Sequence, residues 1–248
     1  MKRPAVLVVR SNGRFSEALR EMGCEVTNLE LIRTEPVNDL SELVKTVRRI
    51  NDYDGIFLTS PAAAEIFLRH QKAEGRRFTG KVYVLGERAR AILDGSGMKL
   101  VSMTDANTAQ DLILSINEAD LTNKNLLFVC GDRSIRTIPE MLGGIARVDE
   151  LVVYRTVENS LDDGVIEGVK ARLKTNDIGW ACFFSPSGVD SFMGRFGNVD
   201  LENVRAAAIG ETTARRAGEV GLHVAFISER SNAEDFAAGF AAYIKNIE

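Results

Sequence analysis

Short apolar runs alternate with amphipathic segments along the chain. Runs rich in β-branched and aromatic residues predict strands over 5–9, 26–32, 55–59, 82–86, 99–103, 125–129, 149–154, 180–184, 206–210 and 223–227. The segments between them, such as 40–50 and 89–93, carry apolar residues at the three-and-four spacing typical of helices. This alternation predicts an α/β fold whose parallel sheets are covered by helices on both faces.

The chain also contains the same series of phrases twice. Three strand-to-helix phrases recur in the same order and at nearly the same spacing: "LTSPAA" as "FSPSGV", "VLGERARA" as "AIGETTARRA", and "TAQDL" as "NAEDF". A strand-helix-strand unit recurs as well, from Ala5 to Arg33-Thr34 and from Asn125 to Arg155-Thr156. Each half of the chain therefore consists of one strand-helix-strand unit followed by three strand-helix units.

Two assemblies fit this repeat. Each strand-helix-strand unit can join the three units that follow it, which gives two consecutive domains. Alternatively, the first of these units joins the last three strand-helix units, which gives one continuous and one split domain. In that case the chain crosses between the domains near 33–37 and 152–158, where two extended segments can pair. Repetition alone leaves both assemblies open.

The repeated phrases place small and hydroxyl-bearing residues at strand-to-helix turns. In open α/β sheets, ligands bind beyond the carboxyl ends of the strands, where the first N–H groups of helices are unpaired. The alternative is that Ser60, Ser185 and Thr212 only cap their helices, with Pro61 and Pro186 in the first turn. Four such turns at equivalent places favour an anion-binding surface.

Composition limits the chemistry further. Hydrophobic residues make up 45% of the 248 residues, and the net charge is −4 with both signs dispersed, which argues against a nucleic-acid or membrane surface. Cys24, Cys130 and Cys182 are expected to be buried apolar residues, and His70 and His223 lack the spacing of a metal site or a Ser-His-Asp triad. No apolar run is long enough for a membrane span or a signal peptide, so a cytoplasmic location is expected.

Motifs for cofactors and covalent catalysis are missing too. Gly86 and Gly210 are single glycines, without a P-loop or a dinucleotide fingerprint. "FFSPSG" lacks the two flanking glycines of a nucleophile elbow, so Ser185 is a poor candidate for a covalent serine. The sequence thus predicts no metal and no cofactor.

A series of short phrases extends over nearly all residues in a fixed order: "VLVVR", "FLTSPAA", "VYVLGERA", "TAQDL", "LLFVCGDRS", "LVVYRTV", "FFSPSGVDSF" and "AAIGETTARRA". In this order and spacing the chain resembles the uroporphyrinogen-III synthase family. The resemblance implies the split assembly, with two flavodoxin-like doubly wound parallel-sheet domains joined by a two-stranded β linker. Domain 1 would comprise 1–34 and 157–248, and domain 2 would comprise 35–156.

The resemblance also implies an activity, that of a cyclising hydro-lyase of haem biosynthesis. A monomeric, cofactor-independent enzyme would close the linear tetrapyrrole hydroxymethylbilane to uroporphyrinogen III, with inversion of ring D and loss of water, in the cleft between the domains. The alternatives are a non-catalytic protein or sensor that binds an anionic ligand on the same fold and, less favoured, a flavoprotein.

Tyr154 matches a tyrosine position of the family, and its phenol could donate a hydrogen bond to the departing hydroxyl. The alternative for Tyr154 is a tyrosine that only packs against one lobe. Either Arg133 or Arg136 would meet the substrate. The other expected substrate-binding residues are Arg10, Thr59, Ser60, Gly86, Gly131, Ser185, Ser187, Gly210, Thr212 and Thr213.

Overall fold

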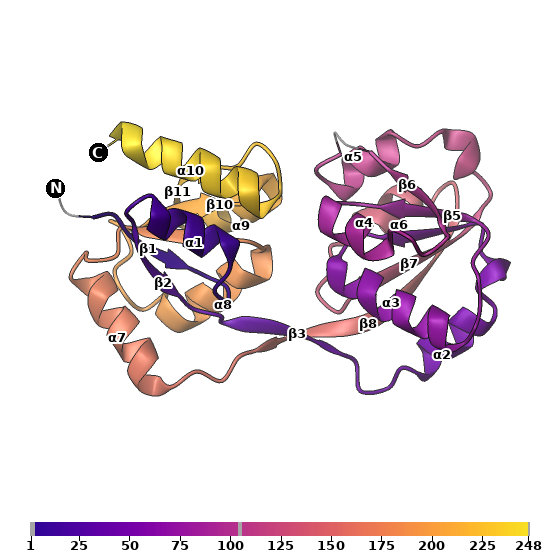
Figure 1. The fold of residues 1–248 in the computed structure, drawn as a ribbon, viewed down its shortest axis with the longest axis horizontal. Helices are drawn as coiled ribbons and strands as arrows, with labels where there is room; N and C mark the ends of the chain where they lie inside the picture. The colour runs from indigo at the N-terminus through magenta and orange to yellow at the C-terminus, as the bar shows by residue number, and fades with distance from the viewer. Residues whose placement is uncertain (1–2, 104–105, 248) are drawn as a thin grey trace. The chain divides into compact units, whose positions relative to one another are not determined.

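The computed structural model describes residues 3–103 and 106–247. The chain divides into two compact units, one made of Met1–Arg33 and Val157–Glu248 and the other of Thr34–Thr156. In each unit helices pack on both faces of a parallel sheet (Figure 1). The α/β fold with parallel sheets that the sequence predicts is thus confirmed.

The first unit contains a sheet in the order β11-β10-β9-β1-β2. β9 is the central strand, and β1, an inner strand, pairs in parallel with β2 on one side and β9 on the other. Residues of β1 alternate between two apolar cores: Leu7 packs on the side of α7, α8 and α9, and Val6 and Val8 pack on the side of α1 and α10. The elements are β1 (Ala5–Val8), α1 (Arg14–Glu21), β2 (Glu25–Asn28), α7 (Asp163–Lys174), β9 (Trp180–Phe183), α8 (Pro186–Phe196), β10 (Arg205–Ala208), α9 (Glu211–Glu219), β11 (His223–Ile227) and α10 (Ala233–Ile247).

The second unit contains a sheet in the order β3-β8-β7-β4-β5-β6. α2, α3 and α4 pack on one face and α5 and α6 on the other. The elements are β3 (Ile32–Pro36), α2 (Ser41–Arg48), a 3-10 turn η1 (Ile50–Asp52), β4 (Gly55–Leu58), α3 (Pro61–Ala73), β5 (Lys81–Val84), α4 (Glu87–Leu93), β6 (Lys99–Ser102), α5 (Ala109–Leu114), a second 3-10 turn η2 (Glu118–Asp120), β7 (Asn125–Gly131), α6 (Thr137–Leu142) and β8 (Arg147–Glu158).

Strand pairing decides how the two repeats assemble. β1 pairs with β9, and β4 pairs with β7. The first strand-helix-strand segment therefore shares a sheet with the last three strand-helix segments, and the second shares a sheet with the first three. The two borders between the units fall inside β3 and β8, and Thr34 belongs to the second unit.

One expected strand, 26–32, is wrong as a single element. β2 ends at Asn28 and β3 begins at Ile32. Leu29 and Leu31 between them are buried in the core of the first unit, and the Leu31 N–H bonds back to the Leu29 carbonyl. This local bend ends the strand, although the apolar pattern runs on without a break.

Two glycine substitutions test how each unit is packed. Gly55→Ala in β4 would bring a Cβ within 2.8 Å of the Tyr83 ring and 3.0 Å of Leu126, so it should destabilise the protein. We expect a loss of about 1–3 kcal/mol in the free energy of unfolding, as for other overpacked cores. Gly168→Ala on the exposed face of α7 meets nothing within 4 Å and should stabilise the protein by about 0.5–1 kcal/mol.

Urea unfolding of the full chain, followed by far-UV circular dichroism, measures both changes. Equal midpoints for the two variants would contradict the packing described for β4.

Candidate functional site

The candidate site residues gather at the carboxyl edges of the two sheets. In the first unit the connections from β1 and from β9 run to opposite sides of the sheet, and in the second unit those from β7 and β4 do the same. Ligands of open α/β sheets bind at such switch points. The residues around each switch point are therefore the first place to look for chemistry, and each unit is described by itself.

Ser60 and Ser185 occupy equivalent positions at the two switch points. The Ser60 Oγ accepts a hydrogen bond from the Ala63 N–H at 3.1 Å, and the Ser185 Oγ accepts one from the Gly188 N–H at 3.1 Å. Proline follows each serine in the first turn, as expected. Both serines thus cap their helices. A serine hydroxyl keeps a hydrogen to donate when its oxygen accepts, so capping and ligand binding are compatible.

Neighbours of these caps share the same half-buried environment. Thr59 precedes the cap of α3 and is half-buried. Ser187 lies 3.1 Å from Ser185 between hydroxyl oxygens, so one of these two hydroxyls donates to the other. A single hydrogen of this pair remains available to a ligand.

The two glycines that precede α4 and α9 differ more than the repeat suggests. Gly86 is exposed, adopts a left-handed φ of 83°, and has open space where a side chain would stand. Gly210 is extended and buried, and a Cβ there would lie 2.5 Å from the Ser231 Oγ. The expected open approach to the helix start is thus present at Gly86 and filled by Ser231 at Gly210.

The expected role of Thr213 needs correction. Its side chain is only 4% exposed, because the α9 period turns Thr213 to the inner face together with Ala214 and Ala217. Its hydroxyl therefore does not line the open edge. Thr212, one position earlier, is half-buried and remains a candidate.

Arg10 follows β1 and stacks on an aromatic ring. Its guanidinium carbon lies 4.4 Å from the centroid of the Phe184 ring, and that ring packs edge-on against Phe15. Asn28 stabilises the loop after β1, because its side-chain N–H₂ donates to the Arg10 carbonyl oxygen at 3.4 Å and to the Ser16 Oγ at 2.6 Å. Stacking orients the plane of a guanidinium and leaves its edge suited to a carboxylate.

Tyr154 lies directly above Gly131 at the end of β7. A Cβ on Gly131 would come within 2.4 Å of the tyrosine ring and 2.8 Å of its phenol oxygen, so only glycine leaves room for the ring. Tyr154 also packs against the core on the side of α2 and α3. Within the part of the chain that the structure describes, its phenol makes no hydrogen bond. The phenol can therefore donate to a ligand without first losing a partner.

The two candidate arginines after β7 have different surroundings. The Arg136 guanidinium pairs with the Glu150 carboxylate at 2.6 Å. Arg133 is exposed and, among residues 3–103 and 106–247, has no ion pair. Arg133 is thus the better candidate for binding an anion.

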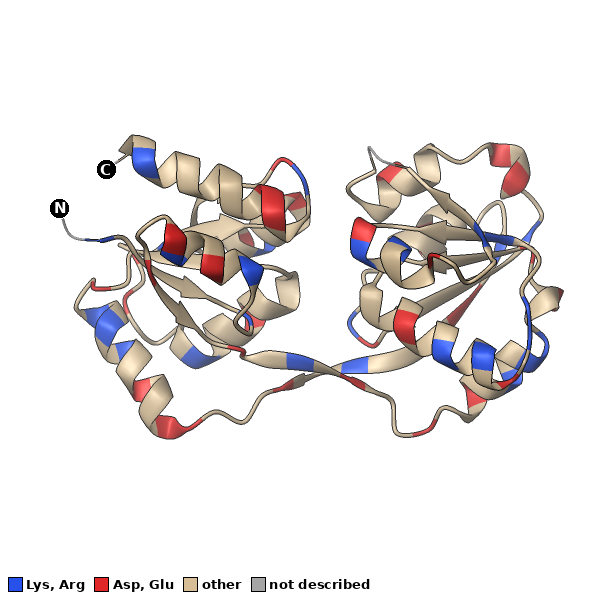
Figure 2. Cartoon of the chain, viewed as in Figure 1, with Lys and Arg blue, Asp and Glu red and all other residues tan. Residues whose placement is uncertain are grey.

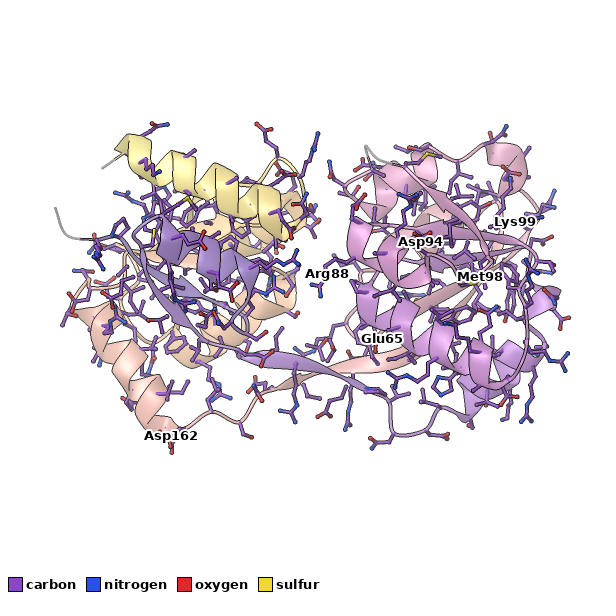
Figure 3. All side chains as sticks on the ribbon, in the orientation of Figure 1. Glu65, Arg88, Asp94, Met98, Lys99 and Asp162 are labelled. Atoms are coloured by element: carbon purple, nitrogen blue, oxygen red, sulfur yellow. The ribbon has the colours of Figure 1, made fainter. Side chains whose placement is uncertain are left out.

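Sequence analysis did not single out Arg88. It stands in the first turn of α4, two positions after Gly86, and projects away from the helix (Figure 3). Its side chain has no ion pair within the described ranges. "GER" is too short a phrase to mark a binding residue, and only its place beside an open helix start draws attention to it. Elsewhere acidic and basic residues intersperse on both units (Figure 2).

Other catalytic groups were also considered. No group of three or more His, Cys, Asp or Glu among the described residues could hold a metal ion. Burial raises the pKa of the Cys130 thiol to about 11 and that of Cys182 well above its usual value, so neither is a thiolate near neutral pH. No described helix combines the length and the apolar character that crossing a bilayer requires.

These features define a class of protein: two parallel α/β units, each with small, hydroxyl-bearing and cationic residues at the carboxyl edge of its sheet. Residues 13–238 match the family model described as uroporphyrinogen-III synthase HemD. The chain belongs to the uroporphyrinogen-III synthase family, which confirms the resemblance found in the sequence.

Individual relatives agree with this assignment. The chain is 28% identical to the uroporphyrinogen-III synthase of Chlorobaculum parvum, over 97% of this chain and 99% of the relative. It is 27% identical to the chloroplastic uroporphyrinogen-III synthase of Oryza sativa, over 88% and 74% of the two chains.

Solved structures agree in fold. A mutant uroporphyrinogen III synthase of Thermus thermophilus matches with a TM-score of 0.68 at 17% identity, over 98% of this chain and 99% of that one. Uroporphyrinogen-III synthetase of Helicobacter pylori matches with a TM-score of 0.62 at 18% identity, over 97% and 99%.

Alkylation should distinguish the three cysteines. A thiol with a pKa of about 11 is a thiolate in only about one molecule in a thousand at pH 8. We expect iodoacetamide to modify Cys130 and Cys182 at least about tenfold more slowly than the half-buried Cys24, as peptide mass spectrometry can measure. In about 8 M urea, which unfolds most domains, the three cysteines should be alkylated at similar rates. Fast labelling of Cys130 in the folded protein would contradict the buried environment.

Proposed function

We propose that this protein is a uroporphyrinogen-III synthase that converts hydroxymethylbilane to uroporphyrinogen III and water. The terminal hydroxyl of the bilane leaves with a proton as water, and the cationic azafulvene that remains closes to a spiro intermediate. Fragmentation and recombination of this intermediate invert ring D. The protein must help the hydroxyl leave and must hold the substrate so that direct closure to the uninverted type I isomer is avoided.

Tyr154 is the proposed proton donor. The observation that supports this role is the phenol at the carboxyl end of β7, which has no hydrogen-bond partner in the described ranges and whose ring is held over Gly131. A phenol donates a hydrogen bond to a departing hydroxyl without needing a metal or a cofactor. Gly131 then contributes by leaving space for the ring.

The carboxylates of the bilane are the proposed ligands of the two carboxyl edges. The protein carries a net charge of −4, so it needs local groups to bind a polyanion. Helix N-termini and hydroxyls satisfy this need at Thr59, Ser60 and Gly86 in one unit, and at Ser185, Ser187 and Thr212 in the other. Arg10 and Arg133 add charged donors, which bind carboxylates more strongly than neutral ones do.

The finer architecture is part of the same proposal. Residues 1–33 with 157–248 and residues 34–156 would form two flavodoxin-like domains, each with the strand order 2-1-3-4-5 counted from its switch-point strand. β3 and β8 would form the two-stranded linker. The cytoplasmic location, the monomeric state and the absence of cofactor, nucleic-acid and membrane partners stay predictions from the sequence.

The names of the relatives favour this function over a non-catalytic anion-binding or sensor protein on the same fold. An assay that separates the type I and type III isomers distinguishes the two functions. A synthase raises the type III fraction without added cofactor, whereas a binding protein leaves spontaneous type I closure dominant.

Removing only the Tyr154 hydroxyl tests the proposed donor. Tyr154→Phe should lower the rate of type III formation by about tenfold to a hundredfold, as expected for one lost general-acid contact. The matched control is Tyr243→Phe in α10, whose ring packs against Trp180 at the amino end of β9. Full activity of Tyr154→Phe, with spontaneous closure subtracted, would show that the donor is misassigned.

The cap serines should act on binding rather than on chemistry. Ser60→Ala and Ser185→Ala should each raise KM on the order of tenfold, because a hydroxyl donor to a carboxylate is lost, with kcat little changed. Thr213→Ala is the control, because its buried hydroxyl does not line the edge. Urea midpoints separate the cost of losing a cap, about 1 kcal/mol, from the loss of substrate binding. Unchanged KM in both serine variants would contradict the proposed carboxylate site.

A further inference from the structure

We propose that Asp132 is a positioning residue for Tyr154, held in place by two hydrogen bonds between the β7 end and β8. This inference rests on the catalytic role proposed above for Tyr154. It concerns residues of the second unit only.

The bonds come from the backbone and the side chain of Asp132. The Asp132 N–H donates to the Tyr154 carbonyl at 3.0 Å. The Thr156 N–H donates to the Asp132 Oδ1 at 2.9 Å. Together they fix the strand on both sides of Arg155.

The side-chain bond replaces a missing backbone bond. In a parallel ladder, a residue that donates to one residue of its neighbour accepts, through its own carbonyl, from the residue two positions further on. Here the carboxylate takes the place of that carbonyl. β7 can then turn away at Ser134, whose Oγ accepts from the Gly131 N–H at 2.9 Å, while β8 continues with its N–H satisfied.

The two hydrogen bonds of Asp132 follow a β-bulge between β7 and β8, and this bulge determines where the Tyr154 ring points. β7 and β8 are in register up to Cys130 opposite Val152, and then Gly131 stands opposite Tyr154, so that Val153 is skipped. Val153 and Tyr154 consequently pack against the same core, whereas successive residues of a regular strand face opposite sides. The two Asp132 bonds come directly after this bulge and hold the ring over Gly131.

The chain supplies a matched control at the opposite end of β7. The Asp54 Oδ2 accepts a hydrogen bond from the Asn125 N–H at 2.9 Å, where β7 begins. Asp54 therefore makes the same kind of contact, a carboxylate that accepts from a strand N–H, but to β7 and at the end of that strand far from Tyr154.

The first measurement tests the hydrogen bond between Asp132 and Thr156 and needs no activity assay. In Asp132→Ala, amide hydrogen exchange by NMR should be faster at Thr156, and in Asp132→Asn it should stay slow because the amide oxygen still accepts. Asp54→Ala should leave exchange at Thr156 unchanged. Unchanged exchange at Thr156 in Asp132→Ala would overturn the proposal.

The second measurement tests whether Asp132 affects catalysis through Tyr154. Asp132→Ala should lower kcat for type III formation on the order of tenfold with KM unchanged, since small displacements of a catalytic group are costly. Asp132→Asn should restore the rate, and Asp54→Ala should keep it.

The double variant separates this inference from the proposed function. In the Tyr154→Phe background, Asp132→Ala should have no further effect on kcat, because the phenol that it positions is gone. If Tyr154→Phe is impaired and Asp132→Ala lowers kcat equally in both backgrounds, or in neither, Asp132 does not act through the phenol and this inference alone fails. If Tyr154→Phe is fully active, the proposed donor fails and this inference fails with it.

Discussion

The parallel pairing of β1 with β9 is the interaction on which the rest of the structure depends. β1 is buried on both faces, with Val6, Leu7 and Val8 at most 1% exposed, so its backbone groups cannot be satisfied by water. They are satisfied by β2, which follows soon in the chain, and by β9, which lies far along it. β9 belongs to the same sheet as β1, so the chain, which leaves the first unit after β2, returns to it, and the second unit is built from the segment between.

This constraint also explains why the candidate site residues stand where they do. At each switch point two neighbouring parallel strands end side by side, and the helices that follow them begin at that edge of the sheet. Ser60 and Ser185 satisfy backbone N–H groups of their helices there, and Ser60 and the Ser185–Ser187 pair each keep one hydrogen for a ligand. In the proposed function, recognition of a polyanion by this acidic protein would depend on the direction of backbone and hydroxyl dipoles more than on net charge.

Tyr154 shows how a single side chain is placed by backbone geometry. Its position in β8 alone does not fix the orientation of its ring. That orientation also depends on the glycine beneath the ring, on the skipped residue in the β7–β8 register and on the hydrogen bonds of Asp132. The same region contains Arg136, which pairs with Glu150, so Arg133 is the better candidate of the two arginines for binding an anion.

Sequence by itself determined the local structure and much of the candidate chemistry. Apolar alternation located the strands, because a strand buried on both faces must be apolar, and proline after serine located two helix starts. The α/β class followed from the alternation of predicted strands and helices, and the family followed from the order of short sequence phrases. The tertiary structure alone decided which repeat unit joins which sheet, because the two strand-helix-strand units are too alike for local pattern to discriminate. It alone showed Ser231 over Gly210, Thr213 turned inward, β2 ending at Asn28, and Asp132 bonded to β8. The contacts of Ser231 and Asp132 join residues of different elements, and such contacts leave no periodic signal in the sequence. The inward side of α9 and the end of β2 depend on how these segments pack in the core of their unit.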